Sequence, residues 1–174
     1  MTVFRYTLPA LLVLASYLPV EALPAGSAQP ATSASRVSLP AGYRDWRMIS
    51  IARETGALDD IRVVLGNDLA IKAFRTGTRP FPAGAQISRL AYRYVPSAQN
   101  DAAFGQQQSF VAGDPTNVQI LVKDSKRFAG TGGWGFGQFI AGKHDPRQAP
   151  MQICFGCHEK RGAADDFVFT RYAP

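Results

Sequence analysis

The pentapeptide Cys154-Phe155-Gly156-Cys157-His158 is the stretch of this chain whose residue types and spacing can do chemistry. Cys-x-x-Cys-His is the attachment sequence of a c-type haem, in which two thiols bond to the porphyrin vinyl groups and the imidazole that follows binds the iron. We therefore predict one covalent haem c, attached through Cys154 and Cys157, with His158 as the proximal iron ligand.

Two other uses of a Cys-x-x-Cys pair compete with this interpretation. A structural zinc site needs about four ligands, and the chain has two cysteines and two histidines, so both histidines would have to be recruited. A thioredoxin-type redox pair is expected in a strand-then-helix setting, which the surrounding sequence lacks, and it gives His158 no role. The haem interpretation is favoured over both alternatives.

Composition indicates one folded domain with a basic surface. The 174 residues are 46% hydrophobic and 18% charged, as in globular proteins, and carry a formal net charge of +6. Arginine and lysine are scattered along the chain, never more than two together and without a basic arm, so we predict no nucleic-acid partner. The positive charge can attract the haem propionates, an acidic redox partner or an anionic membrane surface.

Residues 1–22 read as a secretory signal peptide. Arg5 supplies a positive start, and residues 8–20 form an apolar run that is followed by small residues, with cleavage expected after Ala22 or after Ala28. A membrane anchor is the alternative, but the run is shorter than a bilayer needs and contains prolines. Because bacteria attach haem to cysteines outside the cytoplasmic membrane, the leader and the motif together predict a periplasmic or secreted protein.

The domain boundary follows from composition. Residues 23–41 are rich in Pro, Ala and Ser and poor in large apolar side chains, which predicts a flexible linker. The folded haem domain is expected to occupy 42–174, a length sufficient for one hydrophobic core.

The domain should begin with short elements. Residues 43–51 show apolar side chains at three-residue spacing, which favours an amphipathic helix, with a strand at 48–52 as the alternative. A β-branched run at 61–65 predicts a strand.

The clearest helix comes next. Asn67 or Asp68 is expected to cap a helix that runs to about Arg75, with Gly77 just past its end. Regular alternation then predicts a strand at 85–95.

The second half should continue as antiparallel strands. Residues 109–112 and 118–123 are predicted to pair as a hairpin across the turn-rich segment 113–117. The haem motif is expected on a helical turn, and the alternation at 166–172 predicts a final strand.

A glycine-rich strand lies between these segments. Gly133, Gly135 and Gly137 would share one bare face, opposite a face with Trp134 and Phe136. Glycine inside a strand often marks the close approach of another surface, for which the flat macrocycle is one candidate. A flexible loop is the alternative.

The ligand on the other side of the iron has few candidates. Only sixteen residues follow His158, and none is Met or His, which argues against an electron-transfer cytochrome of the type that brings a distant downstream Met to the iron. Met48, Met151 and His144 remain, but Met151 is too near the motif to cross the haem, and His144 is more typical of a surface loop. We therefore expect an open distal position.

Several segments of the chain carry a resemblance to a known family: Gly66-Asn67-Asp68, Phe81-Pro82-Ala83-Gly84-Ala85, Gly133-Trp134-Gly135-Phe136, the pentapeptide, and Asp166-Phe167-Val168-Phe169-Thr170. Over roughly residues 42–174 they together resemble the cytochrome P-460 family, which includes the β-sheet cytochromes c prime-beta. The resemblance implies an α+β fold, mainly an antiparallel β-sheet with flanking helices, with a covalent c-type haem near the C-terminus, His158 as proximal ligand and a five-coordinate iron.

The resemblance also implies two kinds of function. Enzymatic members oxidise hydroxylamine and carry a lysine cross-linked to the porphyrin, whereas c prime-beta members lack the cross-link, line the distal side with Phe and bind nitric oxide. The strand after the Pro-Gly turn, where that lysine is expected, offers Arg89, a protonated and poorly nucleophilic side chain. Lys72 is the nearest alternative and should face solvent.

We therefore predict an exported mono-haem cytochrome that binds small nitrogen-oxide ligands such as nitric oxide, carries electrons, or does both. The alternative is an oxidoreductase acting on hydroxylamine or nitric oxide, which would need a distal base such as Glu54, Glu159 or Asp68. The expected partners are a small diatomic or nitrogen-oxide ligand and an acidic redox partner, and a homodimer is left open. Candidate pocket residues, each also suited to the core, are Phe74, Phe81, Phe104, Phe136 and Tyr92.

Overall fold

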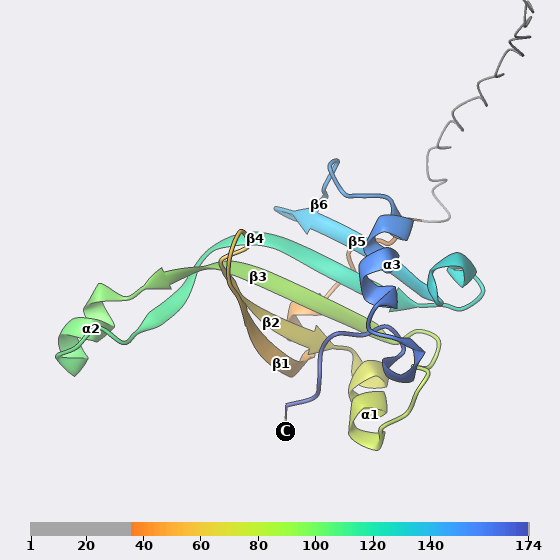
Figure 1. Cartoon of the computed structure of the whole chain (residues 1–174), viewed down its shortest axis with the longest axis horizontal. Coiled ribbons are helices and arrows are strands. Elements are labelled where there is room, and N and C mark those ends of the chain that lie inside the picture. The colour runs from red at the N-terminus through yellow and green to blue at the C-terminus, as the bar shows by residue number, and fades with distance from the viewer. Residues whose placement is uncertain (1–35, 174) are drawn as a thin grey trace, which may run out of the picture. The chain divides into compact units, whose positions relative to one another are not determined.

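The computed structural model describes residues 36–173, and within them the chain forms a six-stranded antiparallel sheet and three α-helices, which confirms the predicted α+β class. Each strand pairs with its neighbour in the sequence, in the order β1-β2-β3-β4-β5-β6 (Figure 1). The strands are β1 (Arg47–Glu54), β2 (Asp60–Gly66), β3 (Gln86–Pro96), β4 (Phe110–Lys123), β5 (Trp134–Ile140) and β6 (Lys143–His144). The helices are α1 (Asp68–Thr76), α2 (Ala98–Phe104) and α3 (Met151–Glu159), with 3-10 turns η2 (Tyr43–Asp45), η3 (Ala129–Thr131) and η4 (Ala163–Asp165).

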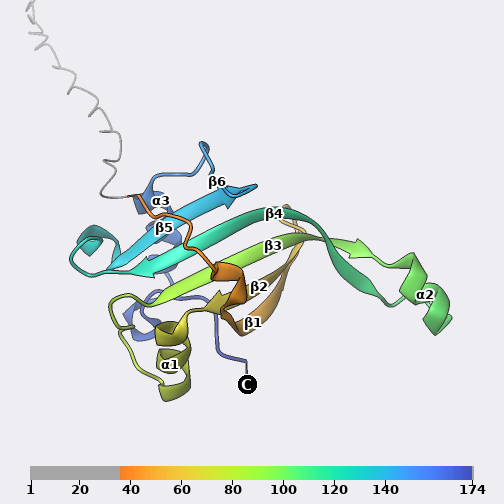
Figure 2. The ribbon, with the colours of Figure 1, turned by 180° about the vertical axis from the view of Figure 1, so that it is seen from behind.

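The two faces of the sheet belong to different cores. One face, which we call the α3 face, contributes Ile87 and Phe136 to a core closed by α1 and α3, which lie in front of the sheet in Figure 1. The opposite face contributes Ile120 and Phe139 to a second core, closed by the N-terminal segment that crosses this face in Figure 2. The haem motif therefore belongs to the α3 face.

Helix α1 forms as its capping residues predict. The Asn67 side chain accepts a hydrogen bond from the Ala70 N–H at 3.0 Å, and it also accepts one from the Gln86 N–H at 3.0 Å. Gly77 ends the helix with φ 67°, and its N–H bonds back to the last turn. One amide side chain thus caps the helix and ties it to the start of β3.

The prediction of a helix at 43–51 is wrong beyond residue 45. Residues 43–45 form η2, and the chain then enters β1, so the alternative strand at 48–52 is confirmed. The reason is an irregularity between Met48 and Ser50 that turns Ile49, which is 0% exposed, into the core. This bulge interrupts the two-residue alternation and leaves a spacing that imitates a helix.

The hairpin predicted at 113–117 is also wrong, because 109–112 and 118–123 belong to a single long strand. That strand, β4, pairs with β3 along its whole length through two register shifts, and Pro115 lies opposite Tyr92. Only residues 118–123 also pair with β5. The turn residues therefore lie on an edge, where a missing N–H is tolerated. The connection between β3 and β4 is α2.

The bare glycine face of β5 is filled by protein side chains. A Cβ on Gly135 would lie 2.3 Å from the Phe128 ring, and one on Gly137 would lie 3.0 Å from Val37. A surface does approach the glycines closely, but it belongs to the core of the opposite face. The macrocycle interpretation of these glycines is therefore wrong, and the aromatic side of β5 is the one that faces α3.

Both ends of the described chain differ from expectation. The strand predicted at 166–172 is wrong, because these residues have no regular secondary structure. The chain bonds to β1 just after them, where the Ala173 N–H donates to the Ile49 carbonyl oxygen at 2.8 Å. The predicted signal peptide and residues 23–35 of the linker lie outside the described residues. Residues 36–41 of that linker instead join the fold, since Val37 is 2% exposed. No helix in residues 36–173 is long and apolar enough to cross a membrane.

Candidate functional site

The three predicted site residues lie together on α3. Pro150 precedes the first turn of the helix. A backbone N–H at this position has no acceptor within the helix, so the missing N–H of proline costs no hydrogen bond. Cys154 and His158 are four residues apart, one helical turn, and their side chains are partly buried. Cys157 is exposed, and both thiols are free. The helix thus presents two thiols and an imidazole side by side, as the sequence predicts.

The thiols do not resemble a reactive redox pair. Burial raises the pKa of the Cys154 thiol above its usual value, and the neighbouring Cys157 adds to that effect. A thioredoxin-type cysteine needs the opposite shift, because the thiolate is the nucleophile. Within residues 36–173 no three Cys, His, Asp or Glu side chains gather as a metal site. The local chemistry therefore suits attachment of a cofactor better than disulfide exchange or zinc.

The imidazole of His158 is oriented for ligation. Its Nδ1 lies 2.8 Å from the carbonyl oxygen of Phe167, which can only accept, so Nδ1 carries the proton and Nε2 keeps a free lone pair. Burial lowers the pKa of His158, which favours the neutral ring that binds a metal. This arrangement of an imidazole held by a carbonyl is typical of a metal-binding histidine.

Aromatic side chains surround the imidazole. The rings of Phe136 and Phe169 lie 4.8 and 5.1 Å from it, between ring centroids. Phe169 and Ile153 remain 56% and 64% exposed, so apolar surface adjoins the thiols. Two thiols, one imidazole nitrogen and an apolar border match what a covalently held macrocycle requires, and the residues present therefore fit a haem.

The carbonyl that holds His158 is itself fixed by a buried ion pair that the sequence analysis missed. Lys123 Nζ lies 2.6 Å from Asp166 Oδ1, and both side chains are at most 4% exposed. Asp166 also accepts the Phe81 N–H at 2.7 Å and, through its carbonyl, the Trp134 Nε1–H at 2.8 Å. The available signal was a lysine at the inner end of an apolar strand.

The backbone beside this ion pair adopts an unusual conformation. Asp166 and Phe167 have φ values of 49° and 62°, in the left-handed region that non-glycine residues rarely occupy. The Phe167 ring packs on Phe155 at 5.1 Å and on Gly132, where a Cβ would come within 2.6 Å of it. Contacts on both sides of the chain therefore hold the Phe167 carbonyl toward His158.

Of the three candidates for a sixth ligand, His144 and Met48 do not lie on the same side of the sheet as His158, and Met151 lies on the same helix as His158. His144 pairs across strands with Phe139 and contacts its ring at 5.5 Å, on the opposite face. Met48 pairs with Leu65, away from the α3 face, and Met151 packs in the first turn of α3 itself.

The five candidate pocket residues separate in the structure. Phe136 contacts His158, whereas Phe74 and Phe81 pack together in the core at 4.9 Å. Phe104 is 60% exposed on α2, and Tyr92 alternates onto the opposite face of β3, where its hydroxyl accepts from Arg44. Of the five, only Phe136 touches the predicted iron ligand.

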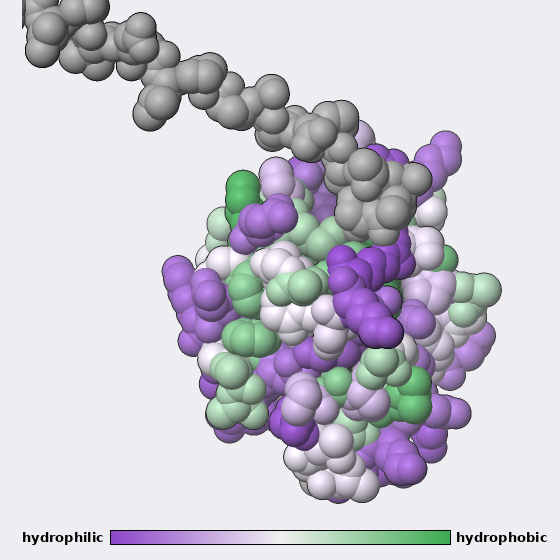
Figure 3. Space-filling view, turned by 90° about the vertical axis from the view of Figure 1, so that its right-hand side faces the viewer, coloured by the Kyte–Doolittle hydropathy of each residue, from purple (hydrophilic) through white to green (hydrophobic). Residues whose placement is uncertain are grey.

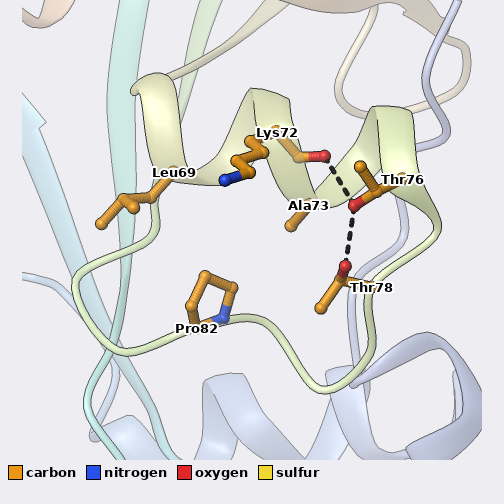
Figure 4. Close-up of a pocket in the computed structure, with 6 residues that line it drawn as sticks. All are labelled: Leu69, Lys72, Ala73, Thr76, Thr78 and Pro82. Atoms are coloured by element: carbon orange, nitrogen blue, oxygen red, sulfur yellow. Dashed lines mark hydrogen bonds between the residues drawn. The ribbon is translucent and has the colours of Figure 1, made fainter.

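Lys72 lies in a different place from the motif. It is exposed on α1 and lines a hollow of about 250 Å³ with Leu69 and Pro82 (Figure 4). All the residues that line the hollow come from 69–82, so the hollow is separate from α3. The face of the molecule seen in Figure 3 alternates small hydrophobic and hydrophilic areas.

The fold and the motif agree with a comparison to known families. The family model described as Cytochrome P460 matches residues 40–170, a span that includes the whole sheet, α1 and α3. A comparison with curated proteins found no match.

Proposed function

The chain belongs to the cytochrome P460 family, and on this basis we propose that it is an exported c-type cytochrome with one haem and an open iron position for small nitrogen-oxide ligands such as nitric oxide. Cytochromes of this family carry haem. The covalent attachment through Cys154 and Cys157 and the location in the periplasm or outside the cell are parts of the proposal.

The hydrogen bond from His158 Nδ1 to the Phe167 carbonyl is the observation that carries the proposal. It fixes the tautomer, so that Nε2 can bind iron, and it does so one residue away from a thiol on the same helix. When bound, the haem supplies an iron that coordinates diatomic ligands. The chain's own part is to hold the imidazole, to shield it with Phe136 and Phe169, and to anchor the macrocycle through the thiols.

Electron transfer is the companion role that we propose. A net charge of +6 would favour an acidic redox partner through long-range attraction. This contribution to the association rate should fall as ionic strength rises, because salt screens exposed charges.

Hydroxylamine oxidation finds less support. Lys123 is the buried lysine on the α3 face, and its ammonium group is occupied by Asp166 and by the Gly132 carbonyl at 3.0 Å. Arg89 occupies the strand position expected for the cross-linked lysine, and Lys72 lies at a separate hollow. We therefore favour ligand binding over oxidation of hydroxylamine.

The ligand assignment can be tested by replacing each histidine in turn. His158→Ala and His144→Ala would be produced with a c-type haem maturation system and compared by haem stain, absorption spectrum and thermal unfolding. We expect His144→Ala to keep the native spectrum and His158→Ala to lose it. The reverse result would overturn both the ligand assignment and the open distal position.

The ligand itself can be tested on the reduced protein. We expect a five-coordinate spectrum that changes when carbon monoxide or nitric oxide is added. A six-coordinate spectrum that changes with neither gas would overturn the proposal. A strongly red-shifted Soret band together with a third protein-to-haem bond in peptide mass analysis would support hydroxylamine oxidation instead.

A further inference from the structure

Two arginines lie next to each other on the α3 face, and only one has a counter-ion. Arg62 of β2 is bound on two sides by the Asp60 carboxylate, at 2.9 Å from both Nε and Nη2, and approaches Glu54 at 3.4 Å. Arg89 of β3 lies one row away, since it pairs across strands with Val64. Asp60 and Glu54, the carboxylates that act electrostatically on Arg89, thus form their ion pairs with Arg62.

Arg89 forms no ion pair within the described part of the chain. Its Nη2 donates to the neutral Asn117 side chain, and its buried Nε has no partner within the described part of the chain. Burial, with a contribution from Arg62, lowers the pKa of Arg89 to about 10, so it remains a cation at neutral pH. A partly buried cation with an unpartnered buried Nε–H and no ion pair of its own is costly, which indicates that an anionic group belongs beside it.

The row of residues that carries Arg89 lies beside the haem motif. Arg89 pairs with Gln119, which pairs with Gln138, two residues along β5 from Phe136. At the other end of the row, Ser50 hydrogen-bonds to Thr170, the neighbour of Phe169. Because Phe136 and Phe169 are the two rings in contact with His158, Arg89 lies on the same face of the sheet as the iron ligand, one row from Phe136.

We propose that Arg89 is the centre of an anion-binding site that takes a planar oxyanion, a carboxylate or nitrite, beside the haem. A guanidinium with a free Nε–H and further Nη hydrogens can donate two parallel hydrogen bonds to such a group. Two sources offer this chemistry: a propionate of the haem itself, or a free anion such as nitrite. The propionate part of this inference rests on the proposed function, whereas the free-anion part does not.

The test compares the haem-loaded parent with Arg89→Gln, which removes the charge, and Arg89→Lys, which keeps it without the planar donor pair. Arg93→Gln is the matched control, because Arg93 alternates onto the same face of β3 but is exposed. One measurement is the affinity for sodium nitrite by titration calorimetry, which needs no haem signal. The other is the haem propionate bending band in the resonance Raman spectrum.

A free-anion site would show about tenfold weaker nitrite binding in Arg89→Gln, with an unchanged propionate band. A propionate site would show a shifted band and unchanged nitrite binding. Arg89→Lys should lie between the parent and Arg89→Gln in whichever measurement responds, and Arg93→Gln should match the parent in both. If Arg89→Gln changes neither measurement, or Arg93→Gln changes them equally, the inference is overturned. Nitric oxide binding by the parent would in that case leave the proposed function standing.

Discussion

Two cations on the α3 face of the sheet, the buried Lys123 and the partly buried Arg89, differ in how completely they are paired. Lys123, at the end of β4, is held by Asp166, by the Gly132 carbonyl and by the Trp134 ring, whose centroid lies 5.0 Å from Nζ. Arg89, in the middle of β3, has one neutral acceptor and an unpartnered Nε. The first cation is part of the machinery that orients His158, and the second remains available to a ligand.

The difference follows from what each cation can reach. Asp166 comes from the C-terminal segment, which crosses the α3 face and closes over Lys123. The cross-strand neighbours of Arg89, Val64 and Gln119, are neutral. The carboxylates of Asp60 and Glu54 form their ion pairs with Arg62 instead. Paired and unpaired charges contribute very differently to stability, so substitutions at the two positions should change the free energy of unfolding by different amounts.

The largest effect is expected for Lys123→Met. It removes the ammonium and leaves the Asp166 carboxylate buried without its ion partner, which should lower the free energy of unfolding by about 3–5 kcal/mol. Denaturation of the haem-loaded protein by urea, followed by circular dichroism, would measure this. Lys143→Met, at an exposed position on β6, is the control and should change little. A loss for Lys123→Met as small as that of the control would contradict a closed, paired site.

The next effect is expected for Gly132→Ala. The new methyl group would collide with the Phe167 ring, at 2.6 Å, on a backbone with φ 62°, and should cost roughly 1–3 kcal/mol. It should also move the carbonyl that holds His158, which the iron–histidine stretching band of the reduced protein would report. Gly130→Ala, in the same turn and with nothing within 4 Å of its Cβ, is the control. An unshifted band in Gly132→Ala would argue that Phe167 does not orient the ligand.

Asn117→Asp should convert the unpaired cation into a paired one. The acceptor atom that already receives the Arg89 hydrogen bond is kept and gains a negative charge, so we expect a stability gain of about 1 kcal/mol. In an Arg89→Met background the same change should lose this gain, as a double-mutant cycle would show. Equal effects in both backgrounds would mean that Arg89 and residue 117 do not interact.

The smallest effect is expected for Arg89→Met. Since the cation forms no ion pair within the described residues, replacing it with an apolar side chain of similar length should leave the free energy of unfolding within about 1 kcal/mol of the parent. Urea denaturation beside Lys123→Met is the direct comparison. A loss as large as that of Lys123→Met would show that Arg89 is already paired, and the distinction between the two cations would disappear.

Local patterns in the sequence determined the attachment motif and the elements that depend on near neighbours. The pentapeptide, the cap at Asn67 and the stop at Gly77 act within a few residues, so their spacing was sufficient. The strand at 61–65 followed from a β-branched run, and the strand at 85–95 followed from alternation, which reflects which face of a strand is buried. The α+β class followed from the resemblance.

Tertiary structure decided the features that depend on residues far apart in the chain. The bulge at Ile49, the edge that admits Pro115 into β4, and the contact of Phe128 with the glycines of β5 exist only because other segments pack there. The pairing of Lys123 with a carboxylate 43 residues away, and the lack of one for Arg89, are of the same kind. Burial and pairing are properties of the assembled sheet, and no local pattern encodes them.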